Sequence, residues 1–548
     1  MPILMKFQEK QRNQDLIRSH EQLWDKYSLA RHTGESLRAL ILPNHTELFN
    51  HLQHEGRERT ERVYDSVAPL AAPRLAAHLA GNVTPSRVQY YDFAPPARDV
   101  SQMTSEDHNW LQDEARAMFE AEQASNYFGE SLKFWLNIAV YGNGAMMCDE
   151  HPRIKGGYLF HTVPYGTYVF DEGIDGLLSR FDRQFEWPLS RIAAQWGEEN
   201  MHPHWKAAMK SDPFQKKKLV HIIRQATKED HDQGVPKRRG IASYYMDLEN
   251  HHALEIGSYH EMPVQIGRWY QAAGEDMGRG VGHDVLADVR SSNEISRLAL
   301  NNLALNVQPT WIGRYEGVIG EPVFRPNSMV WVQEPGDLVQ AQNNARLDIQ
   351  QYGQERLQST INRAFFQDII NVTQQQPQGR TPISATQINA NIDFLLPIIG
   401  PYLSKIEFEY IVPQKSRQFN IRLRAGLVAP IPDNLQQLFA ANGNLINVAI
   451  KGPIAKAIQK TNLDSMDAML TRITTVSAGM PGFLDEINVE RTTRLWAEGE
   501  NAPIEMFNTE DEKAEIQEQR AAALAQDQED QDIKEGSEVA KNLGGLPT

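Results

Sequence analysis

The chain has 548 residues and a formal net charge of −16 at pH 7, with 41% hydrophobic and 23% charged residues. This length predicts several folding units with a large buried core, and the composition excludes a fibre, a disulfide scaffold and a wholly disordered chain. The only cysteine, Cys148, can form no intrachain disulfide, and a zinc site built from several thiolates is excluded.

The acidic balance and the lack of long apolar segments narrow the range of partners. Tight duplex binding depends on Lys and Arg neutralising phosphates, so an acidic chain that handles DNA must do so without gripping it. Two short basic clusters, residues 216–218 and 237–239, are interpreted as solvated loops. The most apolar window, residues 392–403, is shorter than the roughly 20 residues that cross a bilayer and contains Asp393. We expect no membrane insertion.

The N-terminal part of the chain predicts helices interrupted by strands. Alanines and leucines at helical spacing predict a helix over residues 67–81, with Pro73 best placed in its first turn. Aromatic residues predict a strand over residues 87–93. Residues 105–140 predict two further helices, followed by a strand at 145–148.

The middle of the chain predicts short strands separated by turns, with two short helices among them. We expect strands at residues 158–162, 168–171, 177–185, 218–225 and 242–256, and helices at residues 190–196 and 204–210. Strands that mostly follow one another without an intervening helix indicate an antiparallel meander. The fold class predicted for the chain is therefore α+β.

Residues 261–375 predict two long helices separated by a small β module. A strand at 263–269 and a glycine-rich turn at 274–282 precede a helix over about 284–306. Glycines, prolines and β-branched residues then predict a compact β insert at 310–339. A second helix over about 342–370 carries an apolar stripe at four-residue spacing: Leu357, Ile361, Phe365 and Ile369.

The remainder of the chain predicts an exposed loop and then helices. Residues 372–380 are polar and cannot bury apolar area. Ser384 and Gln387 have the spacing of a capping box, which predicts a helix reaching about residue 411. Residues 433–508 predict a long helical segment, and the acidic end beyond residue 525 predicts disorder.

Motifs for the common catalytic chemistries are missing from the sequence. There is no Gly-Lys-Ser/Thr phosphate loop, no His-Glu-x-x-His zinc helix and no Gly-x-Ser-x-Gly nucleophile turn. Gly278, Gly280 and Gly282 resemble a dinucleotide fingerprint only loosely, and we interpret them as a flexible turn. Acid pairs such as Asp171 and Glu172 are expected by chance in an acidic chain. We therefore predict no catalytic residues, no metal site and no cofactor.

The ordered features resemble the portal, or head-to-tail connector, proteins of short-tailed bacteriophages. The resemblance is spread in the right order over most of residues 60–500. Its matching stretches are residues 64–81, 132–146, 263–288, 381–388 and 483–496. Two positions depart from the pattern, since relatives often carry an acidic residue where Gln387 stands and an aromatic residue where Met277 stands.

The resemblance implies a portal fold made of named parts. It implies an α+β wing, two stem helices, a small β clip, a tunnel loop, a wing helix and strand, a helical crown and an acidic disordered tail. The wing is residues 1–283, the first stem helix 284–306, the clip 307–341 and the second stem helix 342–370. The tunnel loop is residues 371–382, the wing helix and strand 383–429, the crown 430–525 and the tail 526–548.

The resemblance also implies an assembly and its partners. Family members form a ring of about twelve subunits at one capsid vertex, which is assembled in the host cytoplasm. Double-stranded DNA passes through the ring during packaging and ejection. The implied protein partners are the major capsid and scaffold proteins, the terminase large subunit and, later, a tail adaptor protein.

Two sets of residues are the predicted functional sites. The tunnel loop would present weak, exchangeable phosphate contacts to DNA through Gln374, Gln375, Gln376, Gln378 and Arg380. The clip carries more aromatic residues than so small a module can bury alone, which predicts contacts with neighbouring subunits or docking partners. These aromatic residues are Trp311, Tyr315, Phe324 and Trp331.

Two alternative functions remain open from the residues alone. The chain could be a different structural protein of the virion, such as a scaffold or minor capsid protein. It could also be a cytoplasmic α+β hydrolase with a site made from scattered His and Asp side chains. A closed ring of subunits would distinguish a portal protein from a monomeric or dimeric enzyme.

Overall fold

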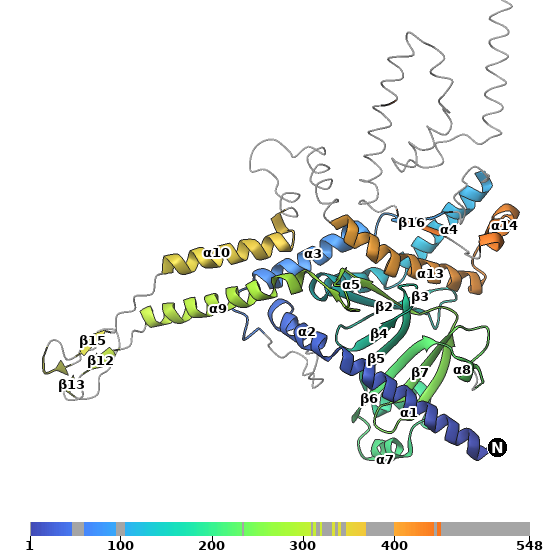
Figure 1. The fold of residues 1–548 in the computed structure, drawn as a ribbon, viewed down its shortest axis with the longest axis horizontal. Coiled ribbons are helices and arrows are strands. Elements are labelled where there is room, and N and C mark those ends of the chain that lie inside the picture. The colour runs from blue at the N-terminus through green and yellow to red at the C-terminus, as the bar shows by residue number, and fades with distance from the viewer. Residues whose placement is uncertain are drawn as a thin grey trace, which may run out of the picture. The chain divides into compact units, whose positions relative to one another are not determined.

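The computed structural model describes most of the first 450 residues (Figure 1). The described ranges are 2–45, 60–94, 105–232, 235–307, 311–313, 318–319, 331–334, 338–340, 347–368, 399–442 and 447–450, together with residue 469. The chain divides into a compact unit, Met1–Ala455, and a second unit, Lys456–Thr548.

The larger sheet is an antiparallel meander of five strands. Its spatial order follows the sequence: β4 (Tyr168–Glu172), β5 (Leu178–Pro188), β6 (Lys216–Gln225), β7 (Ile241–Asp247) and β8 (Ala253–Tyr259). Short turns join β4 to β5 and β7 to β8, whereas helices lie in the connections on either side of β6. The predicted meander is confirmed for its later strands, but the strand predicted at residues 158–162 belongs to another sheet. Residues 242–256 form two strands rather than one, because a turn at residues 248–250 separates them.

Helices cover both faces of this sheet, so its central strand is buried on both sides. Val220 and Ile222 of β6 pack with Leu16 and Ile17 of α1 (Pro2–Lys26). Leu219 points to the opposite face and packs with Leu189 of α6 (Leu189–Trp196) and with α7 (Pro203–Ser211). The alternation of side chains along a strand sends neighbouring residues to opposite faces, which produces these layers.

A three-stranded antiparallel sheet forms the second centre of the unit. Its order is β3 (Tyr158–Val163), β2 (Asn143–Glu150) and β9 (Val264–Arg268), so the middle strand pairs with one neighbour nearby in sequence and one far away. The largest hydrophobic cluster includes residues of β2 and β3 and of α5 (Tyr127–Tyr141), in which Phe134 and Trp135 are fully buried.

Four further helices contribute residues to this largest cluster. They are α2 (Ser28–Ile41), α3 (Val67–Val83), α4 (Ser105–Gln123) and α13 (Val412–Ala425). The prediction that Pro73 lies in the first turn of its helix is wrong, because α3 begins at Val67 and Pro73 lies inside it. The lost backbone hydrogen bond is offset by the buried Ala71, Ala72 and Leu75, which pack the helix in the main cluster.

Two long helices lie side by side, as predicted (Figure 1). They are α9 (Val281–Val307) and α10 (Leu347–Ala364). The predicted stripe is confirmed in its middle, since Ile361 and Phe365 are buried and Leu357 is half-buried, whereas Ile369 lies outside the described residues. Between the helices lie two short hairpin-like pairs: β12 (Trp311–Gly313) with β15 (Leu338–Gln340), and β13 (Val318–Ile319) with β14 (Trp331–Val332).

The later part of the unit differs from the prediction at two elements. A strand was expected between the wing helix and residue 429, but α13 is helical through Ala425 and ends at Gly426, whose φ of 68° suits glycine. A continuous helix was expected from residue 433, but α14 (Asp433–Asn442) is followed by β16 (Asn447–Ile450).

Strand β16 forms because it pairs with β1, which has no other strand partner among the described residues. It pairs antiparallel with β1 (Tyr91–Ala94), with Val448 opposite Phe93. The alternating residues Val448 and Ile450 are β-branched, which favours a strand once a partner edge is available. The remaining elements are α8 (Lys228–Asp232), β10 (Tyr270–Gln271) paired with β11 (Gly278–Arg279), and a π-helical segment, η2 (Glu407–Ile411). No helix in the described ranges is both long enough and apolar enough to cross a bilayer.

Candidate functional site at the base of the long helix pair

The segment that leads into α9 crosses the end of α5 in direct backbone contact. Gly142 ends α5 with a φ of 75°, and a Cβ there would lie 2.2 Å from the carbonyl carbon of Arg279. A Cβ at Gly280 would lie 2.5 Å from the backbone nitrogen of Gly142. The interpretation of the glycine-rich segment as a flexible turn is therefore wrong at this point. These glycines allow two chain segments to pack closely.

Asn143 joins the two crossing segments by hydrogen bonds. Its Nδ2 donates to the carbonyl oxygen of Gly278 at 2.9 Å, and its Oδ1 accepts from the backbone N–H of Gly278 at 2.8 Å. The side chain is fully buried and so acts in place of a strand partner. The start of α9 is consequently fixed to the sheet that contains β2.

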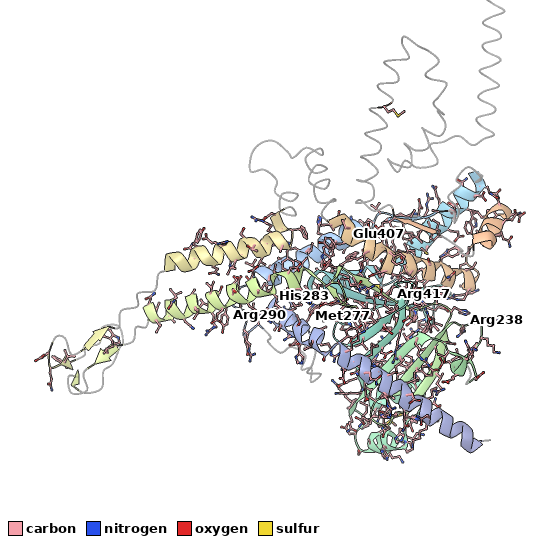
Figure 2. The ribbon with its side chains drawn as sticks, in the orientation of Figure 1. Arg238, Met277, His283, Arg290, Glu407 and Arg417 are labelled. Atoms are coloured by element: carbon pink, nitrogen blue, oxygen red, sulfur yellow. The ribbon has the colours of Figure 1, made fainter. Side chains whose placement is uncertain are left out.

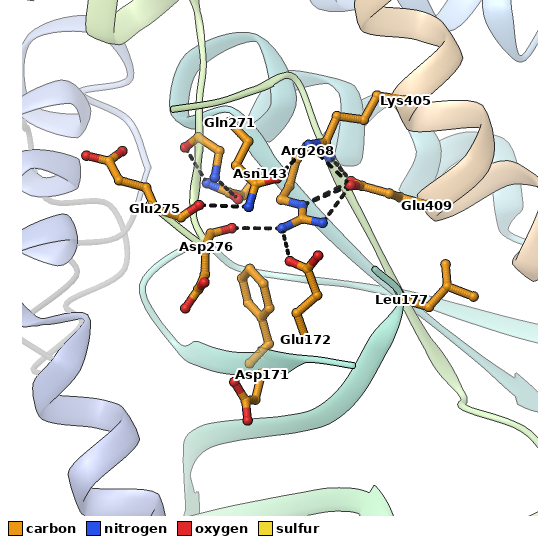
Figure 3. Close-up of polar contacts among 12 residues, drawn as sticks. Asn143, Asp171, Glu172, Leu177, Arg268, Gln271, Glu275, Asp276, Lys405 and Glu409 are labelled. Atoms are coloured by element: carbon orange, nitrogen blue, oxygen red, sulfur yellow. Dashed lines mark hydrogen bonds and ion pairs between the residues drawn. The ribbon is translucent and has the colours of Figure 1, made fainter. Parts of the chain in front are cut away.

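Arg268, the last residue of β9, is the centre of a buried polar network (Figure 3). Its Nη2 donates to Oε1 of Glu409 at 2.6 Å, and its Nη1 donates to Oε2 of Glu172 at 2.6 Å. Nη1 also donates to the backbone carbonyl of Asp276 at 3.0 Å. Arg268 is only 4% exposed, so its charge is compensated inside the protein rather than by water.

The network explains how this charge is tolerated. Burial by itself lowers the pKa of Arg268, but the hydrogen bonds to Glu409 and Glu172 outweigh that effect and raise the pKa above its ordinary value. Lys405 supports the same carboxylate, with its Nζ 3.5 Å from Glu409 Oε1 and 2.7 Å from Oε1 of Gln271. The arrangement joins β4, β9, the glycine-rich segment and a helix from the later part of the chain.

Glu409 reaches Arg268 from the π-helical segment η2. The wider turn of a π-helix changes the direction of the side chains that it carries, and Glu409, Tyr410 and Ile411 all face the interior. The helical run that includes η2 begins at the first described residue after 369–398. Residues 369–398 include the predicted tunnel loop. The network therefore uses the first described helical run that follows this loop in the chain.

The outer side of the glycine-rich segment holds the N-terminal helices. Asp276 Oδ2 lies 2.5 Å from Nζ of Lys26 and accepts a 2.9 Å hydrogen bond from the hydroxyl of Tyr27. Burial and this contact raise the pKa of Tyr27. Burial lowers the pKa of His283, one turn into α9, to about 4, with a further contribution from Arg279.

This network has no direct signal in the sequence, since Arg268 and Glu409 are 141 residues apart. The only local sign of the network in the sequence is a charged residue, Arg268, at the end of β9. Glu172 belongs to the acid pair to which little weight was given, and its partner is an arginine. In the described ranges, no three His, Cys, Asp or Glu side chains are grouped to hold a metal ion. Met277, the position that departs from the portal pattern, is buried in a core cluster (Figure 2).

A buried His–Asp pair lies outside this network. His20 Nδ1 is 2.9 Å from Asp182 Oδ2, and its Nε2 is 2.7 Å from Nε2 of Gln184. Both members of the pair are fully buried, and Arg180 also donates to Asp182. Because both ring nitrogens are engaged and no solvent reaches them, the pair anchors α1 to the sheet.

The predicted tunnel-loop residues, Gln374, Gln375, Gln376, Gln378 and Arg380, lie outside the described residues, as do Tyr315 and Phe324 of the predicted clip. The other two clip residues are described. Trp311 lies in β12 opposite Gln340 and is 39% exposed, and Trp331 lies in β14 opposite Ile319 and is 66% exposed. They belong to two different strand pairs.

The distal half of α9 carries large apolar side chains on its surface. The buried residues of this helix end at Ser296, where Oγ accepts a hydrogen bond from Gln354 of α10. Beyond that point the exposed apolar residues are Leu298, Leu300, Leu303, Leu305 and Val307. Exposed apolar residues gathered on one element are typical of an interaction surface.

Comparisons with known proteins identify the family to which the sequence is similar. A family model described as bacteriophage head to tail connecting protein matches residues 13–507. The portal protein of Salmonella phage epsilon15 is 21% identical over 493 residues, which cover 84% of this chain and 83% of the relative. The probable portal protein of Bordetella phage BPP-1 is 19% identical over 521 residues, covering 93% and 91%.

Among solved structures, a chain from the virion of a native gene transfer agent particle aligns over 84% of this chain and 92% of its own length. Its sequence identity is 13% and its TM-score is 0.33, a value too low to support an argument about the fold.

Proposed function

The chain belongs to the family of bacteriophage head-to-tail connecting proteins, and on that premise we propose that copies of it close into a ring of about twelve at one capsid vertex. Its role is that of a portal protein, a virion component that connects head and tail. The proposed ring is the conduit through which double-stranded DNA is packaged and ejected.

One observation carries the proposal of a ring, namely the apolar surface on the distal half of α9. Five large apolar residues lie exposed there in a single chain, among them Leu303, which is 56% exposed. Burial of such side chains contributes roughly 25 cal/mol per Å² of apolar area, so their exposure on one helix segment favours a protein partner. A second copy of the chain supplies that partner at every position of a closed ring.

The proposed division of labour follows the parts of the chain. Helices α9 and α10 act as the stem, residues 307–341 as the clip and residues 371–382 as the tunnel loop. Residues 430–525 act as the crown, and the remaining N-terminal and central residues as the wing. The exposed Trp311 and Trp331 support the clip assignment, since aromatic residues are enriched at interfaces.

The proposed partners differ in how they are held. DNA slides past the amides of the tunnel loop and Arg380, because an acidic chain denies it the counterion release that drives tight binding. The terminase large subunit and later a tail adaptor dock at the clip, and the major capsid and scaffold proteins contact the wing. Assembly takes place in the host cytoplasm.

A structural rather than catalytic role is part of the proposal. The one buried His–Asp pair described above has its second ring nitrogen beside Gln184, so the imidazole has no free position from which to accept a proton from a substrate. This removes His20 from the scattered His and Asp residues on which the alternative hydrolase would depend.

Imaging of the purified protein by negative-stain electron microscopy, together with its native mass, tests the ring. We expect closed rings with a central hole for the wild type, and loss of rings for Leu303→Glu. The matched control is Ile174→Glu, because Ile174 is also exposed but lies in the turn between β4 and β5. Monomers alone from the wild type under all assembly conditions would overturn the proposal.

A further inference from the structure

A cleft of about 560 Å³ lies away from the long helix pair, where three parts of the unit meet. Its walls come from the end of β2 and the following loop, from Arg239 together with the end of β8, and from α13. Figure 2 labels Arg417 on α13 and Arg238, the neighbour of Arg239, on the loop before β7. The volume is in the range that accommodates a small ligand or a short stretch of peptide.

Two of the arginines in the cleft are held in place by one carboxylate. Glu261 accepts from Nη1 of Arg417 at 3.0 Å and from Nη1 of Arg424 at 2.5 Å. Arg417 also donates from Nε to the carbonyl oxygen of Cys148 at 2.8 Å. Its side chain is only 3% exposed, and its guanidinium lies over the ring of Tyr259, 5.5 Å from the ring centroid. Its hydrogen bonds to described residues come from Nε and Nη1, and none comes from Nη2. This leaves an oriented, nearly buried donor group unused.

Two further cations of the cleft have no carboxylate partner among the described residues. Arg239 donates from Nη1 to the backbone carbonyl of Ser258 at 3.0 Å, and its other nitrogens are unused. Lys155, in the loop after β2, is exposed. Apolar surface lies beside these donors, since Ile421 and the ring of Tyr259 also form the walls. The cleft therefore offers positive charge next to a hydrophobic contact.

The adjoining strand provides a place for an extended chain. Strand β8 pairs only with β7 in the described ranges, so it is an edge of the five-stranded sheet, and its last residues line the cleft. An edge strand can pair with an added peptide through its free backbone groups.

We propose that this cleft binds a short acidic peptide segment of a partner protein. A carboxylate of the peptide is held by Arg239 and the free nitrogen of Arg417, which suit the fork geometry of a carboxylate. An adjacent apolar side chain of the peptide packs on Ile421 and Tyr259. A phosphate backbone fits less well, because it brings no apolar side chain to the wall formed by Ile421 and Tyr259.

The test measures binding of a labelled peptide to the full-length protein by fluorescence anisotropy. The probe is Ac-Glu-Leu-Glu-Leu-Glu-amide, and the neutral reference is Ac-Gln-Leu-Gln-Leu-Gln-amide. We expect the acidic peptide to bind and the neutral peptide not to bind. Binding of the acidic peptide should weaken at high salt. The double variant Lys155→Gln/Arg239→Gln is expected to bind about tenfold more weakly, which is the effect of one lost hydrogen bond to a charged group.

The matched control is Lys237→Gln/Arg238→Gln. It also removes two positive charges, both from the basic cluster 237–239, but it changes no residue that lines the cleft. It is expected to bind the acidic peptide as the wild type does. A photo-crosslinking version of the peptide should label residues 150–156 or α13, which gives a readout that needs no variant. Equal binding of both peptides, or equal losses in both double variants, would overturn the proposal. These measurements do not depend on ring closure.

Discussion

Arg268 keeps its charge inside the protein because its N–H groups are shared among Glu409, Glu172 and the carbonyl of Asp276. Such a network is stabilising only while it is complete. Removing one charged partner of a buried pair costs about 3–5 kcal/mol, whereas replacing the whole pair by apolar groups costs much less. The two segments that it joins, β9 and η2, are therefore held together by a contact that is sensitive to single substitutions.

We predict that Glu409→Ala destabilises the protein by about 3–5 kcal/mol, because it leaves Arg268 buried with one carboxylate fewer. Chemical denaturation followed by intrinsic fluorescence measures the change. The control is Glu294→Ala, which breaks an ion pair with Arg297 on the exposed surface of α9. That variant should unfold as the wild type does, and an equal loss in both variants would contradict the role given to the network.

The imidazole of His283 makes stability depend on pH. Its folded pKa of about 4 lies below the ordinary value of 6.5, so the unfolded chain binds the proton more readily. The stabilisation is complete above pH 6.5 and is lost as the pH falls from 6.5 to 4. The slope contributed by this one group is at most about 1.4 kcal/mol per pH unit.

Urea denaturation at several pH values checks this dependence. We expect His283→Gln to lose less stability than the wild type between pH 6.5 and 4. His204→Gln, at an exposed position on α7, serves as the control and should follow the wild type. Parallel curves for the wild type and His283→Gln would show that another group is responsible.

At the scale of elements, the crossing of α5 and the start of α9 has no room for a side chain. We predict that Gly280→Ala destabilises the protein by several kcal/mol, since its Cβ meets backbone atoms that cannot move without disturbing α5. Gly353→Ala is the matched control, because Gly353 lies within α10 and its Cβ would meet nothing within 4 Å. That change should stabilise by about 0.5–1 kcal/mol. Thermal unfolding of both variants distinguishes steric conflict from a general effect of alanine.

Elements whose pattern is local were predictable from the sequence. The five-stranded meander and the two long helices follow from turn residues and from the periodicity of apolar positions. Elements that depend on a distant partner were not. Strand β16 was predicted as helix because only pairing with β1, more than 350 residues earlier, makes a strand favourable there. Pro73 was placed at a helix start because its packing against other helices cannot be read locally.

The candidate site was predictable only as a place and not as a set of contacts. The sequence predicts a glycine-rich segment before α9, but glycines alone do not distinguish flexibility from close packing, and only the position of Gly142 shows that they allow close packing. Arg268 and Glu409 meet through tertiary structure alone. The tunnel-loop residues stay a prediction, because they lie outside the described residues.

At the scale of the whole molecule, the proposed conduit predicts separate roles for assembly and for DNA contact. We predict that Arg380→Ala leaves ring formation intact and changes packaging or retention of the genome, because it removes one phosphate contact per subunit. Electron microscopy measures ring formation, and nuclease-protected DNA per particle measures packaging. The control is Arg153→Ala, an exposed arginine in the loop after β2. Normal packaging and retention in Arg380→Ala would remove the role given to this residue.

The pairing of β1 with β16 also has a consequence for biosynthesis. At a synthesis rate of about 5–20 residues per second, β1 leaves the ribosome roughly 20–70 s before its partner is made. During that interval the nascent chain presents an unsatisfied strand containing Tyr91 and Phe93, which can pair with other polypeptides. Overproduction is thus expected to yield inclusion bodies unless the rate of translation is reduced or a chaperone shields this strand until synthesis passes residue 450.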